Sequence, residues 1–554
     1  MRGLRAGVAR GRVEGQHSPV EAPHRRPGNA PAQGRRPPGN PRHASRSIDV
    51  QHPAPQAIPA PEIDVHRRIR SAAILALALV AVGPVRAASD LPAIGDPVDQ
   101  VLSPRDEAAI GRDMMARARD QLDLNRDPEV AAYVDSVGQR LTAQVDNRPV
   151  NGFTFFVVHD PRINAFAAPG GYIGVNSGLF LKADNEAELA GVMAHEIAHV
   201  TQRHIARAYA ASQRASYKTI AAVLAGLILG AQDPQAGQAA ITSGVAAQAQ
   251  SQINYTRQNE NEADRIGIGY LAAAGYDPGA MADMFGILQR AAGGSGNAEP
   301  EFLRTHPLTT NRIAEAQGRA AQMHVQNPRE DTLAFHLMQT RLQVMESDEP
   351  RALASRWHAE QVPDDKSYDA AARRYGLALL NLRDGDPGAA AEALRALHDQ
   401  DRDNLHYGLA LARADQALGQ IDSAIERWRS LRDLYPGSYA VAATGADFLV
   451  AAGRAPEAVD VMTSYLRRDG AVAPEAWRDL AEAAQAAGRP ARSHEALGEF
   501  YVHTDRLARA LDQLQLALAK AEKGSPEALR LKARIDQVRT EQHQRIEETP
   551  VSGS

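Results

Sequence analysis

The sequence predicts a mainly α-helical protein in which an α+β domain with a small sheet is followed by an α-solenoid. Three observations support this prediction. A helix-like run over Glu188–Arg203 holds two histidines and a glutamate among apolar residues, and short β-rich runs lie upstream of it. From about residue 367 the chain is rich in Ala and Leu and repeats every 34 or 35 residues.

Composition limits the classes of protein that need to be considered. The chain has 554 residues, of which 44% are hydrophobic and 23% charged, so it is long enough for two or more domains. Its formal net charge of -5 gives no indication of nucleic-acid binding, and we expect none. Because it has no cysteine, disulfides, cysteine–zinc sites and a lipidated N-terminal cysteine are excluded.

The N-terminal region divides into two segments of different character. Residues 1–64 are rich in Arg, Pro and Gly and are expected to be disordered, although a basic arm that binds RNA is a weaker alternative. Residues 65–87 combine a basic start, an apolar core at Ala72–Val82 and small residues at Val85–Ala87, which is typical of a signal peptide. We therefore expect a misassigned start and a mature protein that is soluble in the periplasm.

Residues 88–325 are expected to form the α+β domain. Val98–Asp146 contains two helical patterns. Phe153–His159 and Gly171–Val175 are short runs rich in β-branched and aromatic residues, bounded by Gly, Pro and Asn, and they predict two strands.

The predicted helix that follows carries the sequence His-Glu-Ile-Ala-His. His195 and His199 are four residues apart, so both imidazoles lie on one helix face and can bind a zinc ion. Glu196 can accept a proton from water at that ion. So short a pattern also occurs by chance, but burying these three polar side chains is costly without a metal. Gln202 and Ile205 stand where a metzincin has Gly and His, which excludes that branch.

A second acidic run, Tyr255–Gly267, could supply a third ligand. It contains Glu260, Glu262 and Asp264, of which the first and last are again four residues apart. One carboxylate can bind the metal while another orients a ligand histidine through its free N–H group. The alternative is a solvated acidic helix face, and the residues alone do not assign the roles.

HEIAHVTQRH followed by ENEAD resembles the gluzincin family of HtpX and the CAAX prenyl endopeptidases. The resemblance implies one Zn²⁺ per chain, with Glu196 as general base, Glu260 as the third zinc ligand and Asp264 supporting the site. The family also has a His and an Arg six residues apart, matched by His306 and Arg312 in RTHPLTTNRIAEA. The resemblance implies that both residues belong to the catalytic group and that Arg312 or His306 steadies the oxyanion.

His306 has a second interpretation, because it precedes Pro307 in a segment that favours a loop. A neutral imidazole there can donate a hydrogen bond to the oxyanion, or it can fill the open position of the metal. We expect the second arrangement in the resting state, with Arg312 as the fixed transition-state group. The alternative is a loop histidine that only bonds nearby backbone.

The segment between the two predicted strands is expected to contact substrate. Strands just upstream of a zinc helix commonly offer an edge to which an extended peptide can add, and in the resembling family this segment borders the active site. A plain structural hairpin is the alternative. The residues predicted to bind substrate are Asn164, Ala165, Phe166, Gly170 and Gly171.

An apolar run at Ile220–Leu229 separates the two halves of the predicted zinc site. It has ten residues, about half of the ~20 needed to cross a bilayer. We therefore expect a small helical hairpin that covers the cleft and possible peripheral membrane contact, with no membrane span elsewhere.

The C-terminal half is predicted to be a repeat domain. Residues 326–366 are expected to be a linker with a bridging helix at Thr332–Ser347, residues 367–540 the repeats and residues 541–554 a disordered tail. Four glycines stand 34, 34 and 35 residues apart, which is the tetratricopeptide period, and a fifth unit at Tyr501–Leu518 lacks its glycine. A plain alanine-rich bundle fits these intervals poorly. The four glycines are Gly385, Gly419, Gly453 and Gly488.

These features together predict a zinc-dependent endopeptidase with a repeat module. A gluzincin domain with such repeats behind a signal peptide resembles periplasmic members of the family, which implies a role in outer-membrane protein assembly and quality control. The expected substrates are misassembled outer-membrane proteins, and the repeats are expected to bind clients or the assembly machinery. The alternative is a repeat-based chaperone or adaptor whose zinc site is mainly structural or latent.

Overall fold

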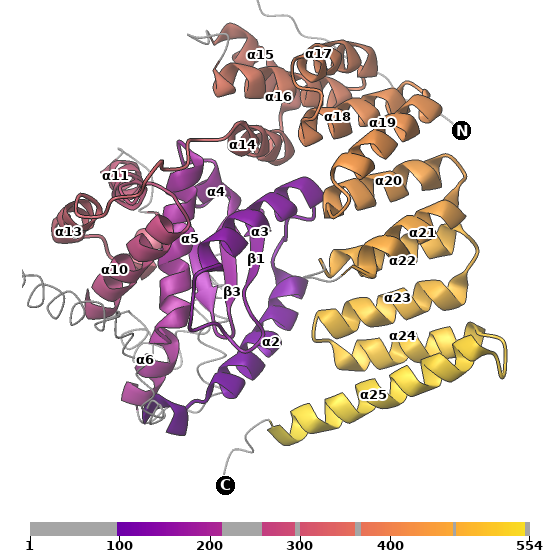
Figure 1. The fold of residues 1–554 in the computed structure, drawn as a ribbon, viewed down its shortest axis with the longest axis horizontal. Coiled ribbons are helices and arrows are strands. Elements are labelled where there is room, and N and C mark those ends of the chain that lie inside the picture. Colours follow the sequence, from indigo (N-terminus) through magenta and orange to yellow (C-terminus); the bar gives the residue numbers. More distant parts are fainter. Residues whose placement is uncertain (1–96, 213–256, 294–299, 361–366, 469–472, 549–554) are drawn as a thin grey trace, which may run out of the picture. The chain divides into compact units, whose positions relative to one another are not determined.

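The computed structural model describes residues 97–212, 257–293, 300–360, 367–468 and 473–548 (Figure 1). The fold is mainly helical with one three-stranded sheet, as the sequence predicted. The predicted disordered segment 1–64, the signal peptide 65–87 and the apolar run 220–229 lie outside the described residues. Within the part of the chain that is described, no helix is both long and apolar enough to span a bilayer.

The N-terminal part combines the sheet with helices on its faces. Its elements are η1 (Pro97–Gln100), α2 (Pro104–Gln121), α3 (Pro128–Thr142), β1 (Thr154–Val158), β2 (Ala165–Ala168), β3 (Tyr172–Asn176), α4 (Ser177–Phe180), α5 (Glu186–Thr201), α6 (His204–Ser212), α10 (Arg257–Ala273), α11 (Ala280–Gly293), α12 (Glu301–Thr305) and α13 (Thr310–Ala320).

The sheet has the order β1-β3-β2, so β2 forms an edge. The two predicted strands are present as β1 and β3, which pair in parallel, whereas β2 was not expected to be a strand and pairs antiparallel with β3. The turn between β2 and β3 needs glycine, because Gly170 and Gly171 have φ of +79° and +94°. A Cβ at Gly171 would also lie 2.4 Å from the carbonyl oxygen of Gly152.

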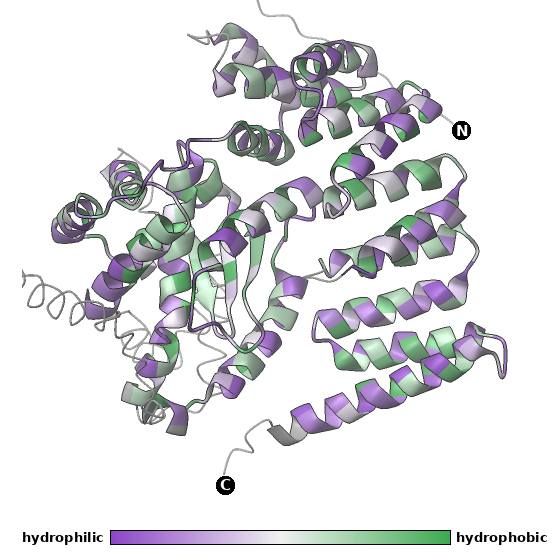
Figure 2. Cartoon of the chain, viewed as in Figure 1, coloured by the Kyte–Doolittle hydropathy of each residue, from purple (hydrophilic) through white to green (hydrophobic). Residues whose placement is uncertain are grey.

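Helix α5 occupies the centre of the N-terminal part. The side chain of Asn185 caps its first turn by accepting a hydrogen bond from the Glu188 amide. The helix packs against β2 and β3 on one side and against α10 and α11 on the other. It is therefore buried almost all round, and Figure 2 shows its largely hydrophobic surface.

The segment predicted to be a linker is instead part of the core. The expected bridging helix is present as α14 (Leu333–Glu346), capped by Thr332, and a second helix, α15 (Pro350–Ala359), was not predicted. Phe335 and Met338 of α14 are fully buried in one hydrophobic cluster that extends from α3 to the first repeats. Helix α14 thus joins the two parts through shared apolar packing, which the prediction of a linker did not anticipate.

A buried group of charges connects the same elements. Arg341 of α14 forms ion pairs with Asp127 (2.6 Å) and Glu129 (3.1 Å) at the start of α3. Glu129 also contacts Arg413 (3.0 Å) and His406 (2.8 Å) of the repeats. Burial raises the pKa of Glu129, but the Arg341 guanidinium and His406 outweigh this and hold it below its ordinary value. Breaking one partner would leave a buried charge, so this cluster fixes the junction.

The repeats form successive helix pairs. They are α16 (Tyr368–Asp384) with α17 (Pro387–Gln400), α18 (Leu405–Ala417) with α19 (Ile421–Leu434), α20 (Tyr439–Ala451) with α21 (Ala455–Leu466), α22 (Glu475–Ala486) with α23 (Pro490–His503), and α24 (Leu507–Lys520) with α25 (Pro526–Glu548). The four predicted glycines each follow the first helix of a pair with φ between +68° and +86°. This is the left-handed conformation that glycine adopts most readily.

The last repeat differs from its prediction in two ways. The fifth pair does have its glycine, because Gly524 separates α24 from α25 with φ +81°. The tail predicted to be disordered from residue 541 is helical to Glu548, since Arg545 pairs with Asp505 (2.7 Å) and with Glu541. The hydrophilic character of α25 in Figure 2 explains why the sequence there favoured a loose tail.

The pKa of Asp479 provides a test of packing in the repeats. Burial raises it to about 6, although the carboxylate accepts a hydrogen bond from the Tyr439 hydroxyl (2.7 Å). The folded state therefore holds the proton to higher pH than the unfolded chain does, and stability falls as the pH rises from about 4 to about 6. Above pH 7, the ionised Asp479 carboxylate lowers the free energy of unfolding by up to about 3 kcal/mol.

We predict that Asp479→Asn raises the melting temperature at pH 7.5 by a few degrees and that the gain shrinks toward pH 4. Thermal unfolding followed by circular dichroism at several pH values measures this. The matched control is Asp512→Asn, at an exposed position of α24, which should change little. A gain that does not depend on pH would contradict the assigned cause.

Candidate metal centre

Four buried side chains converge beside α5. Ligand atoms of His195, His199, Glu260 and His306 all lie within 4.8 Å of one another, and each residue is at most 3% exposed. The Nε2 atoms of His195 and His199 are 3.0 Å apart, and each lies 3.5 Å from the Glu260 carboxylate. Packing of α5 against α10 thus brings together the two sequence segments that were predicted to form one site.

His195 is oriented by Asp264. Its Nδ1 atom lies 2.9 Å from a carboxylate oxygen of Asp264, on the side opposite Nε2. Asp264 is itself held by a bidentate pair with Arg312, at 2.8 Å for both nitrogens. Asp264 therefore lies behind the His195 ring, where a carboxylate can fix the orientation of an imidazole.

Arg312 occupies a position that differs from the expected one. Its Nη1 atom bonds the Pro307 carbonyl oxygen (2.8 Å) and lies 3.0 Å from Glu260, while its other nitrogens bond Asp264. A guanidinium whose donors are engaged in this way, with only 4% of the residue exposed, is poorly placed to reach a substrate oxyanion. The geometry favours a positioning role toward Glu260 and Asp264, in place of the predicted transition-state contact.

His306 lies at the C-terminal end of α12, outside the helix interior as predicted. Its Nδ1 atom is 3.1 Å from Glu260 and 3.4 Å from Nε2 of His195, and its ring stacks on Phe302. The imidazole therefore lies within the ligand group itself. This placement suits a fourth metal ligand better than it suits a residue that only bonds local backbone.

Glu196 faces the same group from α5. Its Oε1 atom lies 3.5 Å from Nε2 of His306. Neither carboxylate oxygen has a hydrogen-bond partner among the described residues, although both are buried. Burial raises the pKa of Glu196, which makes this carboxylate a stronger proton acceptor.

The donor set fits a divalent cation. Two imidazoles and one carboxylate are the His₂Glu set of catalytic zinc sites. Burial lowers the pKa of His195, but the carboxylates of Asp264 and Glu260 outweigh it and raise the pKa to about 9. Burial lowers the pKa of His199 well below its ordinary value. The buried carboxylate oxygens of Glu196 that lack partners also point to a missing polar species, so the residues present fit a metal ion with water.

Strand β2 presents a free edge next to this group. The Asn176 amide donates to the Asn164 carbonyl (3.0 Å), so this pair is hydrogen-bonded across the β2–β3 ladder. Because such pairs alternate along antiparallel strands, the backbone groups of Ala165 and Ala167 point away from β3. The N–H group of Ala167 lies near enough to Glu196 to lower its pKa slightly, although it does not form a hydrogen bond of normal geometry with either carboxylate oxygen.

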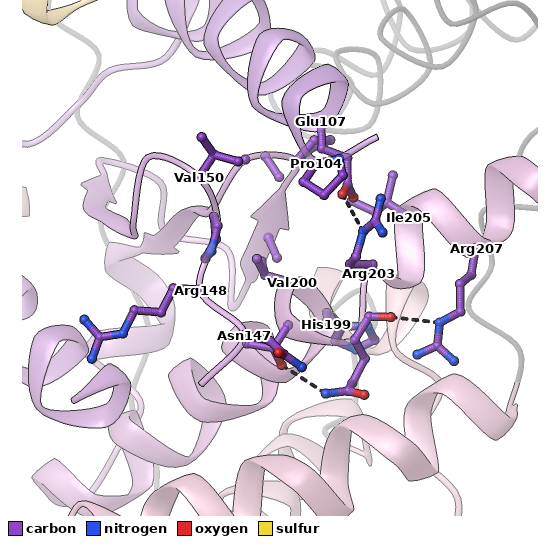
Figure 3. Close-up of a pocket in the computed structure, with 17 residues that line it drawn as sticks. Pro104, Glu107, Asn147, Arg148, Val150, His199, Val200, Arg203, Ile205 and Arg207 are labelled. Carbon is purple, nitrogen blue, oxygen red and sulfur yellow. Dashed lines mark hydrogen bonds and ion pairs between the residues drawn. The ribbon is translucent and has the colours of Figure 1, made fainter. Parts of the chain in front are cut away.

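A cleft of about 630 Å³ begins at this edge and reaches His199 (Figure 3). Its lining includes Ala167, Ala168 and Gly170 of the β2 region together with Val200 and Arg203. An extended peptide along β2 would therefore pass beside the metal ligands.

The predicted substrate residues have different surroundings. Ala165 is buried with outward-directed backbone, and Gly170 lines the cleft. Phe166 packs edge-on against Phe156, at 5.8 Å between ring centroids. Asn164 is buried, and its backbone pairs with β3. Gly171 is required by the turn and packs against Gly152, which gives it a structural role.

Two residues near the site, His204 and Glu262, were given no role from the sequence. His204 is fully buried, with its Nδ1 atom 2.8 Å from Nδ1 of His199. Its other ring nitrogen lies 3.3 Å from Glu262. The available signal was a third histidine five residues after the last one of the zinc pattern, but its position depends on the left-handed conformation of Arg203 between α5 and α6, which spacing does not reveal.

Comparisons with known proteins agree with this geometry. Residues 128–320 match peptidase family M48. The beta-barrel assembly-enhancing protease of Escherichia coli (strain K12) is 35% identical over 474 residues, which cover 84% of this chain and 95% of that protein. A putative protein of the same name from Vibrio cholerae is 34% identical and covers 81% and 92%. The mitochondrial metalloendopeptidase OMA1 of Schizosaccharomyces pombe is 30% identical and covers 33% and 51%.

Solved structures of tetratricopeptide proteins share little sequence identity with this chain. A thermophilic TPR protein from Thermus thermophilus is 18% identical with a TM-score of 0.24, covering 38% of this chain and 100% of that one. Yeast Tom70 is 10% identical with a TM-score of 0.26, covering 65% and 85%. At such scores the likeness carries no argument, so the repeat assignment rests on the period and on the helix pairs.

We predict that Glu260→Ala abolishes stoichiometric metal binding, because two imidazoles without the carboxylate hold a divalent cation much more weakly. Metal analysis of the purified protein measures this. Glu315→Ala, an exposed glutamate on α13, is the matched control and should keep the metal content of the wild type. One full metal equivalent in Glu260→Ala would remove this residue from the ligand set.

Proposed function

The chain belongs to peptidase family M48, and we propose that it is a zinc-dependent endopeptidase with His195, His199 and Glu260 as the zinc ligands. The observation that carries the proposal is the convergence of these three groups in a buried site beside Glu196 and the free edge of β2. Bound zinc supplies a Lewis acid that polarises the scissile carbonyl and lowers the pKa of water.

The chain's own residues supply the remaining chemistry. Glu196 takes a proton from the attacking water and passes it to the leaving amine, as its raised pKa favours. Asp264 fixes the orientation of His195, and Arg312 holds both Asp264 and Glu260 in place. The surrounding apolar rings, including Phe285 and Phe302, exclude bulk water and strengthen these interactions.

Substrate binding is proposed to use the outer edge of β2. A peptide strand can pair with the outward backbone groups of Ala165 and Ala167, which places its carbonyl beside Glu196. Gly170 extends this edge along the cleft. Backbone pairing of this kind accepts many sequences, as a protease acting on unfolded or misassembled proteins requires.

The proposed setting is the periplasm. Residues 65–87 have the pattern of a signal peptide, and the relatives that cover most of the chain are named for β-barrel assembly. We propose that the substrates are misassembled outer-membrane proteins and that the repeats bind clients or the assembly machinery. Peripheral membrane contact through residues 220–229 belongs to the same proposal.

A repeat-based chaperone with a latent zinc site is the second candidate function. It is favoured by one observation, the position of His306 within the ligand group, because a fourth protein ligand would close the metal site. We propose that His306 caps the metal in the resting enzyme. The two functions then describe closed and open states of one site.

We predict that Glu196→Gln abolishes hydrolysis of a casein-type substrate, because the glutamine amide cannot accept a proton from water. Zinc should stay near one equivalent per chain, because residue 196 is not one of the proposed zinc ligands. Zinc analysis and a proteolysis assay on the same preparation measure both quantities. Glu315→Gln is the matched control. Undiminished proteolysis in Glu196→Gln would remove the proposed general base.

We predict that His306→Ala raises basal proteolysis, because the cap is removed and the fourth position of the metal is opened. The assay compares the purified variant with the wild type under the same conditions, with exposed His324→Ala as control. A fall of roughly 10²–10³-fold would instead identify His306 as an oxyanion donor.

A further inference from the structure

His204 lies directly behind the metal ligand His199. The Nε2 atom of His199 faces His195 and Glu260, and its Nδ1 atom lies 2.8 Å from Nδ1 of His204. The two rings meet edge to face, with centroids 4.8 Å apart. Both residues are essentially without solvent exposure, so no water competes for this contact.

The contact determines which ring nitrogen carries each proton. A metal at Nε2 of His199 requires the lone pair there, so the proton of a neutral imidazole lies on Nδ1. This N–H group can then donate to Nδ1 of His204, which must be the unprotonated nitrogen of that ring. His204 therefore carries its own proton on Nε2.

Glu262 accepts a hydrogen bond from this Nε2–H group. Its Oε2 atom lies 3.3 Å from Nε2 of His204 and 3.0 Å from Nη2 of Arg207 on α6. Arg207 is itself fixed by donating to the carbonyl oxygen of Gln202 (2.8 Å), a bond drawn in Figure 3. The carboxylate thus holds a defined position from which it can order both histidines.

The short connection between α5 and α6 places His204 beside the last turn of α5. Helix α5 ends at Thr201 and α6 begins at His204, so only two residues connect the two helices. Arg203 takes the left-handed conformation there, with φ of +51°, which is uncommon for a residue other than glycine. Ion pairs of its guanidinium with Glu107 (2.7 Å) and Asp99 hold this turn. A strained turn held in this way indicates that the position of His204 matters.

We propose that His204 is a positioning residue that fixes the tautomer and orientation of the metal ligand His199, and that Glu262 fixes His204 in turn. This rests on the proposed zinc site. Each ligand histidine then has its own support, since His195 is oriented directly by Asp264 while His199 is oriented by a carboxylate through an intervening imidazole.

The experiment measures Zn²⁺ affinity of the purified full chain by competition with a chromogenic chelator, and the visible absorption of the Co²⁺-substituted protein. His204→Leu removes the acceptor, and we expect a loss of affinity of about 10–100-fold. His204→Asn keeps an acceptor oxygen near the place of Nδ1 and should recover most of the affinity. Glu262→Leu should weaken binding several-fold with an altered Co²⁺ spectrum, whereas Glu262→Gln, which keeps an acceptor, should stay near the wild type.

His324→Leu and Glu315→Gln are matched exposed controls. Wild-type Zn²⁺ affinity in His204→Leu overturns the inference, while wild-type protein that binds no Zn²⁺ overturns the proposed function itself. Unfolding of the metal-free variants is measured in parallel. If His204→Leu does not fold, the two variants Glu262→Leu and Glu262→Gln test the inference in its place. Equal Zn²⁺ affinity in Glu262→Leu and the wild type then overturns the inference.

Discussion

The burial of Glu260 beside two histidines is the constraint on which the rest of the N-terminal part depends. A carboxylate that is 1% exposed is costly unless positive charge surrounds it. Arg312 and His306 come from two segments of the chain that follow α11, and both contact Glu260 directly. Helices α10, α12 and α13 are thus packed around one charge, and a metal cation would complete the compensation that these groups begin.

The same packing separates the two sides of the site. On one side, the buried Asp264 carboxylate is held by Arg312 and lies 2.9 Å from Nδ1 of His195. On the other, the cleft reaches His199, and the edge of β2 offers backbone groups next to Glu196. Rigid support and an accessible edge therefore meet at this group of buried side chains.

The repeats are joined to this site by shared packing and charge. One hydrophobic cluster runs from α3 through α14 into the first repeats, and the Glu129 carboxylate binds groups from both parts. At the other end of the repeats, Arg506 pairs with Asp120 of α2 (2.8 Å). The repeats thus contact the N-terminal part near both of their ends.

The sequence by itself determined the fold class, the helix of the two histidines, the acidic helix and the repeat period, because each depends on local spacing. Helical periodicity placed His195 and His199 on one face. The repeat glycines recur because the backbone has a positive φ at each of these positions. Only the tertiary structure decided that α14 belongs to the core, that β2 is an edge strand, that Arg312 is held by carboxylates and that His204 stands behind His199. Those outcomes depend on contacts between residues distant in sequence, and in the last case on one left-handed residue, Arg203, so spacing alone could not reveal them.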